Sequence, residues 1–374
     1  MAAQSGCQPD GDEDLLLQPG NTPGGSEHPI KEQQAMENVP VFVGLDYHSK
    51  SVQVCVMDGS GAVLVNRRCG NSVMEIGGAI GSGREVRRAA IESCCGAADL
   101  AEALITELGW PVSLAHPGYV ARMKHNPDKT DFGDARMLAE LACAGLIPPV
   151  WLAPRNVREL RLLARLRGDL VGAVRAAKTR ILAVLRQQRI TEPTGFGRWC
   201  KKWLAWLTSA ECALSEQGRF AVGIYLEELA ALRDRISKVE SRLREATADD
   251  AIVARLLRVK GVGEVTAWTM RALIGRFDRF TSGKQLARFC AVTPRNASSG
   301  QRVADSGMIK AGDPQLKSVV IEAAQRLRRY EPRWRELSAS MAARGKPASV
   351  ITGAVANRWL RGLYHQMKEL PMAA

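Results

Sequence analysis

The segment KTDFGDARMLAEL at residues 129–141 constrains this chain most, because it joins two aspartates to the start of an apolar helical pattern. Asp131 and Asp134 lie three residues apart, so on a helix both carboxylates extend from the same face. A carboxylate pair of this kind predicts a shared ligand. The alternative interpretation is a helix that begins with acidic residues and binds nothing, since acids stabilise helix N-termini.

Two further acids follow short apolar runs earlier in the chain. Asp46 comes directly after the run 41–45, and Glu92 follows the run 89–91. We expect both runs to be strands, with the acids at their ends. Carboxylate oxygens are the ligands that Mg²⁺ prefers, and Mg²⁺ beside a phosphate supports phosphoryl transfer. Together with the aspartate pair, these acids favour a magnesium site over a solvated helix start.

The charge of the chain indicates a polyanionic partner. Its 374 residues carry a net charge of +13. The first 37 residues hold seven acids and one lysine, so the remainder is more basic still. A body this basic favours nucleic acid as the partner, and a basic soluble protein without that role is the alternative. The length predicts two or three domains.

The cysteines and apolar runs predict a cytoplasmic protein. The nine cysteines are scattered, without a C-x-x-C pair or a zinc-ligand spacing, as expected in a reducing compartment. No apolar run approaches the length of a membrane span, and the acidic N-terminus is unlike a secretory signal. We therefore expect no membrane partner.

The N-terminal part combines a tail with an α/β domain. Residues 1–38 are rich in Gly, Pro and acids and predict a disordered tail. Residues 39–150 predict a mixed sheet with helices, in which sites lie at the carboxyl ends of strands. The expected strands are 41–45, 51–57, 62–65, 86–91 and 110–115, and the expected helices are 97–108 and 133–144.

Residues 151–249 predict a basic helical region. The stretches 155–190 and 229–243 place apolar residues in alternating steps of three and four, the heptad pattern of a coiled coil. That pattern fits a dimer seam or an antiparallel hairpin within one chain. Between the helices, RWCKKWLAW at 198–206 combines Trp with Arg and Lys, which suits either nucleotide stacking or a packed linker.

Residues 250–374 predict a mostly helical unit. The segment LLRVKGVGEVTA at 256–267 has the glycine spacing of a helix-hairpin-helix turn. In such a turn, Lys260, Gly261 and Gly263 bring backbone N–H groups close to a phosphate, whereas a tight turn without a ligand is the alternative. Further helices are expected at 283–291, 313–330 and 347–368.

A long polar segment at 293–310 separates two of these helices. It has several hydroxyls and basic residues and almost no core residues, so it predicts a loop. A loop of this length is a candidate for function, although most such loops are surface connections.

Five segments in order resemble the transposases of insertion-sequence family one-ten, the bridge-RNA-guided recombinases. The most specific is residues 129–141, which is similar to the family pattern K-T-D-x-x-D-A-x-x-L-A-E. The resemblance covers roughly residues 39–370. The other segments are VGLDYHSKS at 43–51, AAIES at 89–93, VKGVGEVTA at 259–267, and FCAVTPRNASSG at 289–300 with IKAGDPQLK at 309–317.

The resemblance implies three domains and a set of site residues. The domains are a RuvC-like (RNase H-fold) DEDD domain at 39–150, a coiled-coil middle at 151–249 and a C-terminal transposase domain at 250–374. The nucleophile is Ser299, which precedes a glycine and adjoins Ser298. The DEDD acids, matched by position, are Asp46, Glu92, Asp131 and Asp134.

This chain departs from the family pattern at two places. Ser-Cys-Cys-Gly follows Glu92, where many relatives have Thr-Gly after a small residue, so the local geometry there is in doubt. The segment MIKAG at 308–312 lacks the serine of the usual I-S-K-A-G. Neither departure removes an expected catalytic group.

The resemblance also implies a mechanism and partners. The family cuts and rejoins DNA through a covalent phosphoserine, with Mg²⁺ held by the four acids. A non-coding bridge RNA selects donor and target DNA, and dimers pair into tetramers with composite sites. The implied location is the bacterial cytoplasm, at the nucleoid during the reaction. Arg295, Arg302 and Lys310 share the polar segment with Ser299, and we expect them to neutralise the phosphate.

Two other functions fit parts of the pattern. A metal-dependent nuclease of the RNase H superfamily, such as a junction resolvase, needs the acids but not Ser299. A non-catalytic nucleic-acid-binding remnant needs neither. The presence of all four acids and the serine argues against a remnant.

Overall fold

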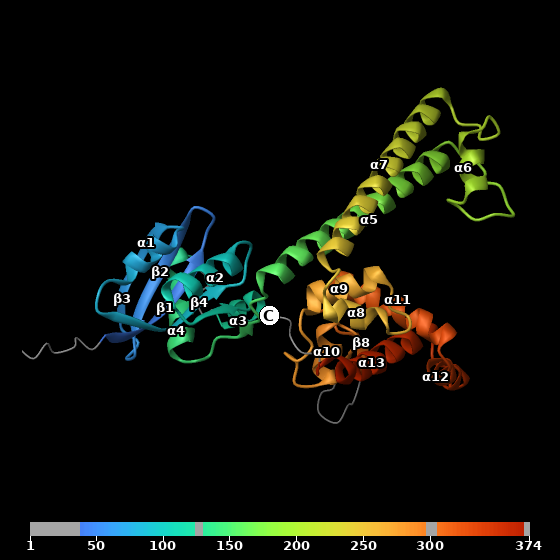
Figure 1. The fold of residues 1–374 in the computed structure, drawn as a ribbon. Coiled ribbons are helices and arrows are strands. Elements are labelled where there is room, and N and C mark those ends of the chain that lie inside the picture. Colours follow the sequence, from blue (N-terminus) through green and yellow to red (C-terminus); the bar gives the residue numbers. More distant parts are fainter. Residues whose placement is uncertain (1–37, 124–129, 297–304, 370–374) are drawn as a thin grey trace, which may run out of the picture. The chain divides into compact units, whose positions relative to one another are not determined.

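The computed structural model describes residues 38–123, 130–296 and 305–369 (Figure 1). All of the predicted tail except Asn38 therefore lies outside the described residues. The described chain forms two compact units. The first contains residues 38–92, 104–112, 121–123 and 130–147, and the second contains residues 93–103, 113–120, 148–296 and 305–369.

A six-stranded mixed sheet forms the N-terminal α/β part, in the order β3-β2-β1-β4-β5-β6. The first three strands form an antiparallel meander, and β1 pairs in parallel with β4. The predicted mixed sheet is thus confirmed. The strands are β1 (Val39–Tyr47), β2 (Ser51–Asp58), β3 (Val63–Gly70), β4 (Arg84–Glu92), β5 (Val112–Ala115) and β6 (Pro149–Val150).

Two interior strands, β1 and β2, carry much of the core of this sheet. Val41, Val43 and Leu45 of β1 are fully buried, and nearly all of β2 is buried as well. Strand β3 is the exposed edge and is polar over much of its length. The helices of this part are α1 (Val73–Ile80), α2 (Ala97–Leu108), α3 (Pro117–Met123) and α4 (Asp131–Cys143).

Helices α5 (Arg155–Gln187) and α7 (Glu216–Ala246) pack against each other as an antiparallel hairpin within one chain (Figure 1). Arg167 and Glu240 form an ion pair across the hairpin, with 2.7 Å between Nη2 and Oε1. Nearer the connecting end, Gln188 Nε2 donates a hydrogen bond to Ser215 Oγ. Of the two interpretations of the heptad pattern, the structure therefore contains the hairpin.

The aromatic-basic piece is a packed linker at the end of that hairpin. Trp203, on α6 (Lys201–Thr208), is 1% exposed, and its Nε1 donates a hydrogen bond of 3.0 Å to Glu192. Its ring packs against Trp199 with 4.6 Å between centroids. Because Trp203 is buried and already hydrogen-bonded, its ring is not available to stack on a nucleotide.

The C-terminal part is a helical cluster around one apolar core. Trp268, Phe277, Leu316, Val355 and other buried residues form this core. Among the described residues, no helix is both long and apolar enough to cross a membrane. The helices are α8 (Ala251–Leu257), α9 (Glu264–Ile274), α10 (Gly283–Phe289), α11 (Pro314–Tyr330), α12 (Pro332–Ala343) and α13 (Ala348–Met367).

The sequence predicts a loop at 293–310, but this segment contains a short β-hairpin. Strand β7 (Pro294–Asn296) pairs antiparallel with β8 (Asp305–Met308). Ile309 N donates a hydrogen bond to Thr293 O and extends the pairing. Backbone groups alone make these bonds, so a polar sequence without an apolar alternation still forms the hairpin.

Candidate metal centre at the carboxyl end of β1 and β4

Asp46 and Glu92 lie at the carboxyl ends of neighbouring parallel strands. Leu45 of β1 pairs with Ile91 of β4, and each acid is the next residue along its strand. Both acids are half-buried. Both acids therefore lie at strand ends, as the sequence predicts.

Helix α4 brings the aspartate pair to the same edge of the sheet. The helix packs directly on β1 at Gly44, where a Cβ atom would overlap the Ala135 carbonyl oxygen and Ala139 N. Thr130 caps the helix, because its Oγ1 accepts a hydrogen bond of 3.1 Å from Gly133 N. This close packing places the first turn of α4, with its two aspartates, beside the end of β1.

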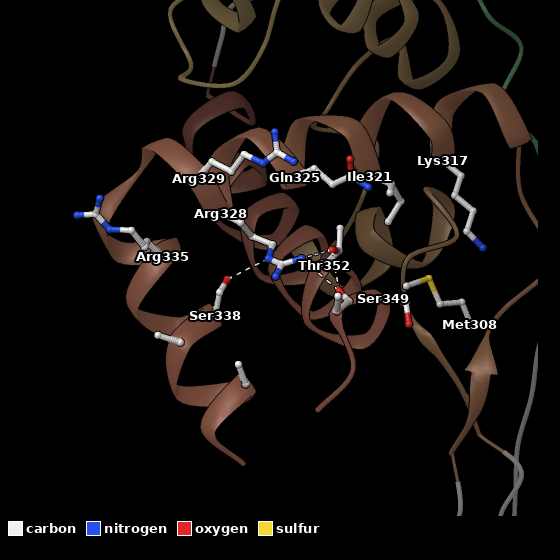
Figure 2. A pocket seen from close by; sticks show the side chains of 13 residues that line it. Met308, Lys317, Ile321, Gln325, Arg328, Arg329, Arg335, Ser338, Ser349 and Thr352 are labelled. Carbon is white, nitrogen blue, oxygen red and sulfur yellow. Dashed lines mark hydrogen bonds between the residues drawn. The ribbon is translucent and has the colours of Figure 1, made fainter. Parts of the chain in front are cut away.

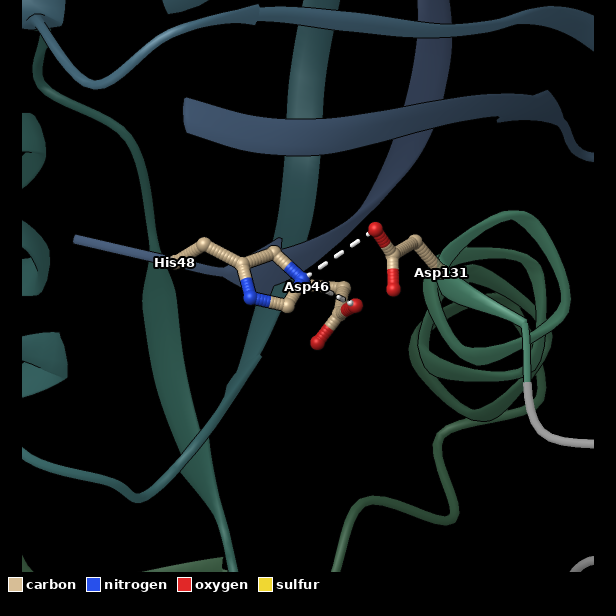
Figure 3. Close-up of side chains that lie close together, drawn as sticks. All are labelled: Asp46, His48 and Asp131. Carbon is tan, nitrogen blue, oxygen red and sulfur yellow. Dashed lines mark ion pairs between the residues drawn. The ribbon is translucent and has the colours of Figure 1, made fainter. Parts of the chain in front are cut away.

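His48 lies between two of the carboxylates (Figure 3). Its Nε2 is 3.2 Å from Asp46 Oδ2 and 3.3 Å from Asp131 Oδ2. Among the described residues, Asp46, His48 and Asp131 offer ligand atoms that lie within 4.8 Å of one another. Asp46 comes from the end of β1, His48 from the turn after it and Asp131 from the start of α4.

Asp46 is held in an unfavourable environment for a carboxylate. Burial is the largest cause that raises its pKa, and the negative charges of Asp131 and Asp134 raise the pKa further. His48 opposes them by charge and by a hydrogen bond. The charge of Asp134 adds to this repulsion, but Asp134 is not among the residues whose ligand atoms lie within 4.8 Å of one another. A cation bound here would relieve both the repulsion and the burial cost.

The donor set fits a divalent cation. Carboxylate oxygens suit hard cations such as Mg²⁺ and Mn²⁺, and an added imidazole nitrogen suits first-row transition metals as well. Asp46, Asp131 and His48 supply such atoms from a half-buried position open to solvent, since 43% of the His48 side chain is exposed. These residues are therefore suited to divalent metal binding.

Comparisons with known proteins agree with this geometry. Residues 43–190 match the family model of the DEDD transposase domain of IS110, and residues 253–339 match the model described as "Transposase IS116/IS110/IS902 family". The chain belongs to the IS110 family of transposases. This is the family that the sequence resembles.

Curated relatives are similar across most of this transposase. It is 25% identical to the transposase for insertion sequence element IS1111A of Coxiella burnetii, over 80% of this chain and 81% of the relative. It is 27% identical to a probable family 20 transposase of Pseudomonas aeruginosa, over 72% of this chain and 81% of the relative. The transposase for IS1328 of Yersinia enterocolitica is 27% identical, over 63% of this chain and 69% of the relative.

The other residues expected in the transposase site are placed differently. Glu92 reaches the correct strand end, but it is not among the residues that lie within ligand distance of one another. Ser299 and Arg302 lie outside the described residues. Arg295 lies on β7 and Lys310 lies two residues after the end of β8. Both residues are exposed.

The glycine turn joins α8 to α9, as the sequence pattern suggests. Gly261 has a φ of +82° and packs against Leu327, where a Cβ would lie 3.0 Å from Cγ. Gly263 is exposed and N-caps α9 without crowding. Lys260 Nζ lies 3.1 Å from Glu331 Oε2. The packing against Leu327 and the positive φ thus explain why residue 261 is a glycine. At Gly263 the space beside the backbone is open to a ligand.

Sequence reasoning missed two residues of this centre, His48 and Arg68. His48 follows Asp46 by two positions in VGLDYHSKS. Its position just after a strand-end acid could therefore have identified it as a candidate metal ligand. Arg68 lies on the edge strand β3, with Nη2 3.3 Å from Asp131 Oδ2 and Nε donating to Ser51 Oγ. Nothing in the local sequence connects β3 to α4, so Arg68 could be found only from the fold.

Proposed function

We propose that this transposase cuts and rejoins DNA through a phosphoserine on Ser299, with Mg²⁺ held at the Asp46–Asp131 centre. The observation that carries the proposal is the convergence of Asp46, His48 and Asp131 at the sheet edge, with Asp134 close enough to raise the pKa of Asp46. The mixed sheet and the strand-end position of Asp46 and Glu92 support an RNase H-like assignment for this domain.

The metal supplies charge stabilisation at the reacting phosphate when it is bound. Asp46 and Asp131 would hold it, with Asp134 and Glu92 as the remaining DEDD acids. Arg68 lies beside Asp131 with its side chain 59% exposed, so its guanidinium is in position to pair with a phosphate oxygen. The acids would hold the metal and Arg68 would orient the phosphodiester, while the covalent step belongs to the serine.

The serine step conserves the phosphodiester bond energy. The Ser299 hydroxyl attacks phosphorus, an Oγ–P bond forms, the P–O3′ bond breaks, and the serine proton passes to the released 3′-hydroxyl. That hydroxyl then attacks the phosphoserine of the partner strand, and the serine is regenerated. No nucleotide cofactor is needed. Arg295 on β7 and Lys310 after β8 are exposed, and they flank Ser299 in the sequence.

The family resemblance supports a bridge RNA and a higher assembly as parts of this proposal. Sequence choice would be delegated to base pairing, which leaves the protein to recognise backbone and shape. The excess of Lys and Arg over Asp and Glu fits that duty. Dimers that pair into tetramers would bring the serine of one subunit to the acids of another.

A covalent-trapping assay tests the serine step. Purified protein is mixed with the RNA transcribed from its element, Mg²⁺ and labelled donor and target DNA, and is then run on a denaturing gel. We expect a protein–DNA adduct with the wild type and with Ser298→Ala, and none with Ser299→Ala. Cleavage that persists in Ser299→Ala without an adduct would replace the proposal with a plain metal-dependent nuclease.

A further inference from the structure

A groove with cationic walls lies between α11, α12 and α13, in the C-terminal part of the chain. Its volume is about 870 Å³, and Figure 2 shows the thirteen residues that line it. Four of them are cationic and none is acidic. The cations are Lys317, Arg328 and Arg329 on α11 and Arg335 on α12.

Arg328 is fixed at the floor of this groove by neutral partners. Its Nε donates to Ser338 Oγ at 3.2 Å, and its Nη1 donates to Thr352 Oγ1 at 2.6 Å and to Ala348 O at 3.2 Å (Figure 2). Ser338 is 8% exposed and Thr352 is 5% exposed. The guanidinium therefore joins three helices, and among the described residues no acid forms an ion pair with it.

The N-terminus of α13 opens into the same groove. Ala348, Ser349 and Thr352, all in its first turns, line the wall. Pro347 occupies the N-cap position and gives no side-chain hydrogen bond. The first N–H groups of a twenty-residue helix are therefore uncapped, which adds hydrogen-bond donors and the positive end of the helix dipole.

Apolar residues form another part of the surface. Ala339 and Ala342 on α12 and Ile321 on α11 line the groove between the cations. Met308 of β8 closes one side, and its side chain packs on Gly353 of α13, where a Cβ would overlap the Met308 methyl group. Cations beside apolar surface suit a chain of phosphates that alternate with sugars.

We infer that this groove binds the phosphodiester backbone of a nucleic-acid strand, outside the Asp46–Asp131 centre. Three features favour a backbone over an isolated anion: cations from two helices, an uncapped helix N-terminus, and apolar surface beside them. Backbone contacts of this type position a strand without reading its sequence. The inference rests on the nucleic-acid chemistry of the proposed function but needs neither Ser299 nor a metal.

Binding measured without Mg²⁺ tests the groove, because strand cleavage then plays no part. Full-length protein is titrated against labelled single-stranded DNA, duplex DNA and RNA of mixed sequence, over a range of salt. The test variant is Arg329→Gln/Arg335→Gln, whose side chains are exposed. The matched control is Arg326→Gln/Arg344→Gln, which removes the same charge from α11 and from the C-cap of α12, outside the groove.

The groove variant is expected to bind about fivefold more weakly or worse, and the slope of its salt dependence should fall by about one for each phosphate that it no longer neutralises. The control should change affinity by less than about twofold. Weaker binding confined to the DNA probes, or to the RNA probe, would identify which strand occupies the groove. Equal binding of all probes by the groove variant and the control would overturn the inference.

A gain-of-charge variant keeps the test independent of any folding defect. Ala342 lines the groove, is exposed and lies in the last turn of α12, where a cation also suits the helix dipole. Ala342→Lys should tighten binding and steepen the salt dependence by about one. A lysine there that left binding unchanged would count against the groove. None of these outcomes depends on the adduct assay, so a failed serine step and a failed groove are distinguishable.

Discussion

Gly44 of β1 lies in backbone contact with Ala135 of α4, so closely that any Cβ at residue 44 would overlap the Ala135 carbonyl oxygen. This contact sets the height of α4 above the sheet. It therefore also sets how near Asp131 and Asp134 come to Asp46.

Gly44→Ala should lift α4 from the sheet and weaken the metal centre at the same time. We expect a decrease of about 1–3 kcal/mol in the free energy of unfolding, as for other overpacked sites. Gly59→Ala is the matched control, because a Cβ there meets nothing within 4 Å. Urea denaturation measures both variants. An unfolding free energy for Gly44→Ala equal to that of the control would contradict this packing.

Divalent metal should stabilise the wild-type protein. A ligand that binds only the folded state adds about 2.7 kcal/mol at a hundred times its Kd. The melting temperature should therefore rise with Mg²⁺ or Mn²⁺ in the wild type and much less in Asp46→Asn or Asp131→Asn. Glu140→Gln, an exposed substitution on the same helix α4, should retain the full rise. Equal shifts in all variants would place the bound metal elsewhere.

Without metal, Asp46 should make stability fall as the pH rises. Burial and its acidic neighbours raise the pKa of Asp46 in the folded state. The folded protein then holds this proton at pH values where the unfolded chain, with a pKa of about 3.9 for this carboxyl group, has released it. The stabilisation is complete below the unfolded pKa and is lost as the pH passes through the folded pKa.

Asp46→Asn isolates this effect. In chelator, the unfolding free energy of the wild type minus that of Asp46→Asn should decrease from acidic pH toward neutrality. The Asn variant should become the more stable protein near neutral pH, because it lacks the buried, repelled charge. A difference that increased with pH would show that Asp46 is instead stabilised as a carboxylate in the metal-free protein.

The glycine turn offers two neighbouring positions with opposite expectations. Gly261 has a φ of +82° and packs on Leu327, so Gly261→Ala should cost about 1–2 kcal/mol of stability from the backbone conformation alone. Gly263 has no atom within 4 Å of an added Cβ, so Gly263→Ala should leave stability nearly unchanged. Thermal melting measures both. If Gly263→Ala weakens binding of duplex DNA while it melts normally, the turn contacts nucleic acid.

The sequence predicts the elements that have a strong apolar pattern. Strands β1, β2 and β4 and helices α2, α4, α5 and α11 are found close to their expected bounds. Strand β3 extends to Gly70, beyond the expected end at residue 65, because an edge strand exposes polar residues such as Arg67. Helix α12 was missed, although Trp334, Ser338 and Met341 are buried at helical spacing.

The candidate site could be predicted only in part, because chain spacing does not give the distance between elements. The acids at 46, 92, 131 and 134 were readable from strand ends and from a helical i, i+3 pair. That Glu92 and Asp134 lie outside the group within ligand distance, whereas His48 lies inside it, depends on side-chain direction. The approach of Arg68 depends on how β3 pairs with β2 and where α4 covers them.

The most direct test of the proposed mechanism compares adduct formation in Asp46→Asn, Asp131→Asn and Glu140→Gln. All three remove one negative charge from the same domain, and only the first two belong to the metal centre. With RNA, DNA and Mg²⁺ present, we predict that the two Asp variants slow the covalent step at least about a hundredfold, as expected when a principal electrostatic group is removed. Glu140→Gln should stay within about twofold of the wild type. Adduct formed at the wild-type rate by Asp131→Asn would contradict the mechanism, because the acids at the sheet edge would then have no part in the reaction.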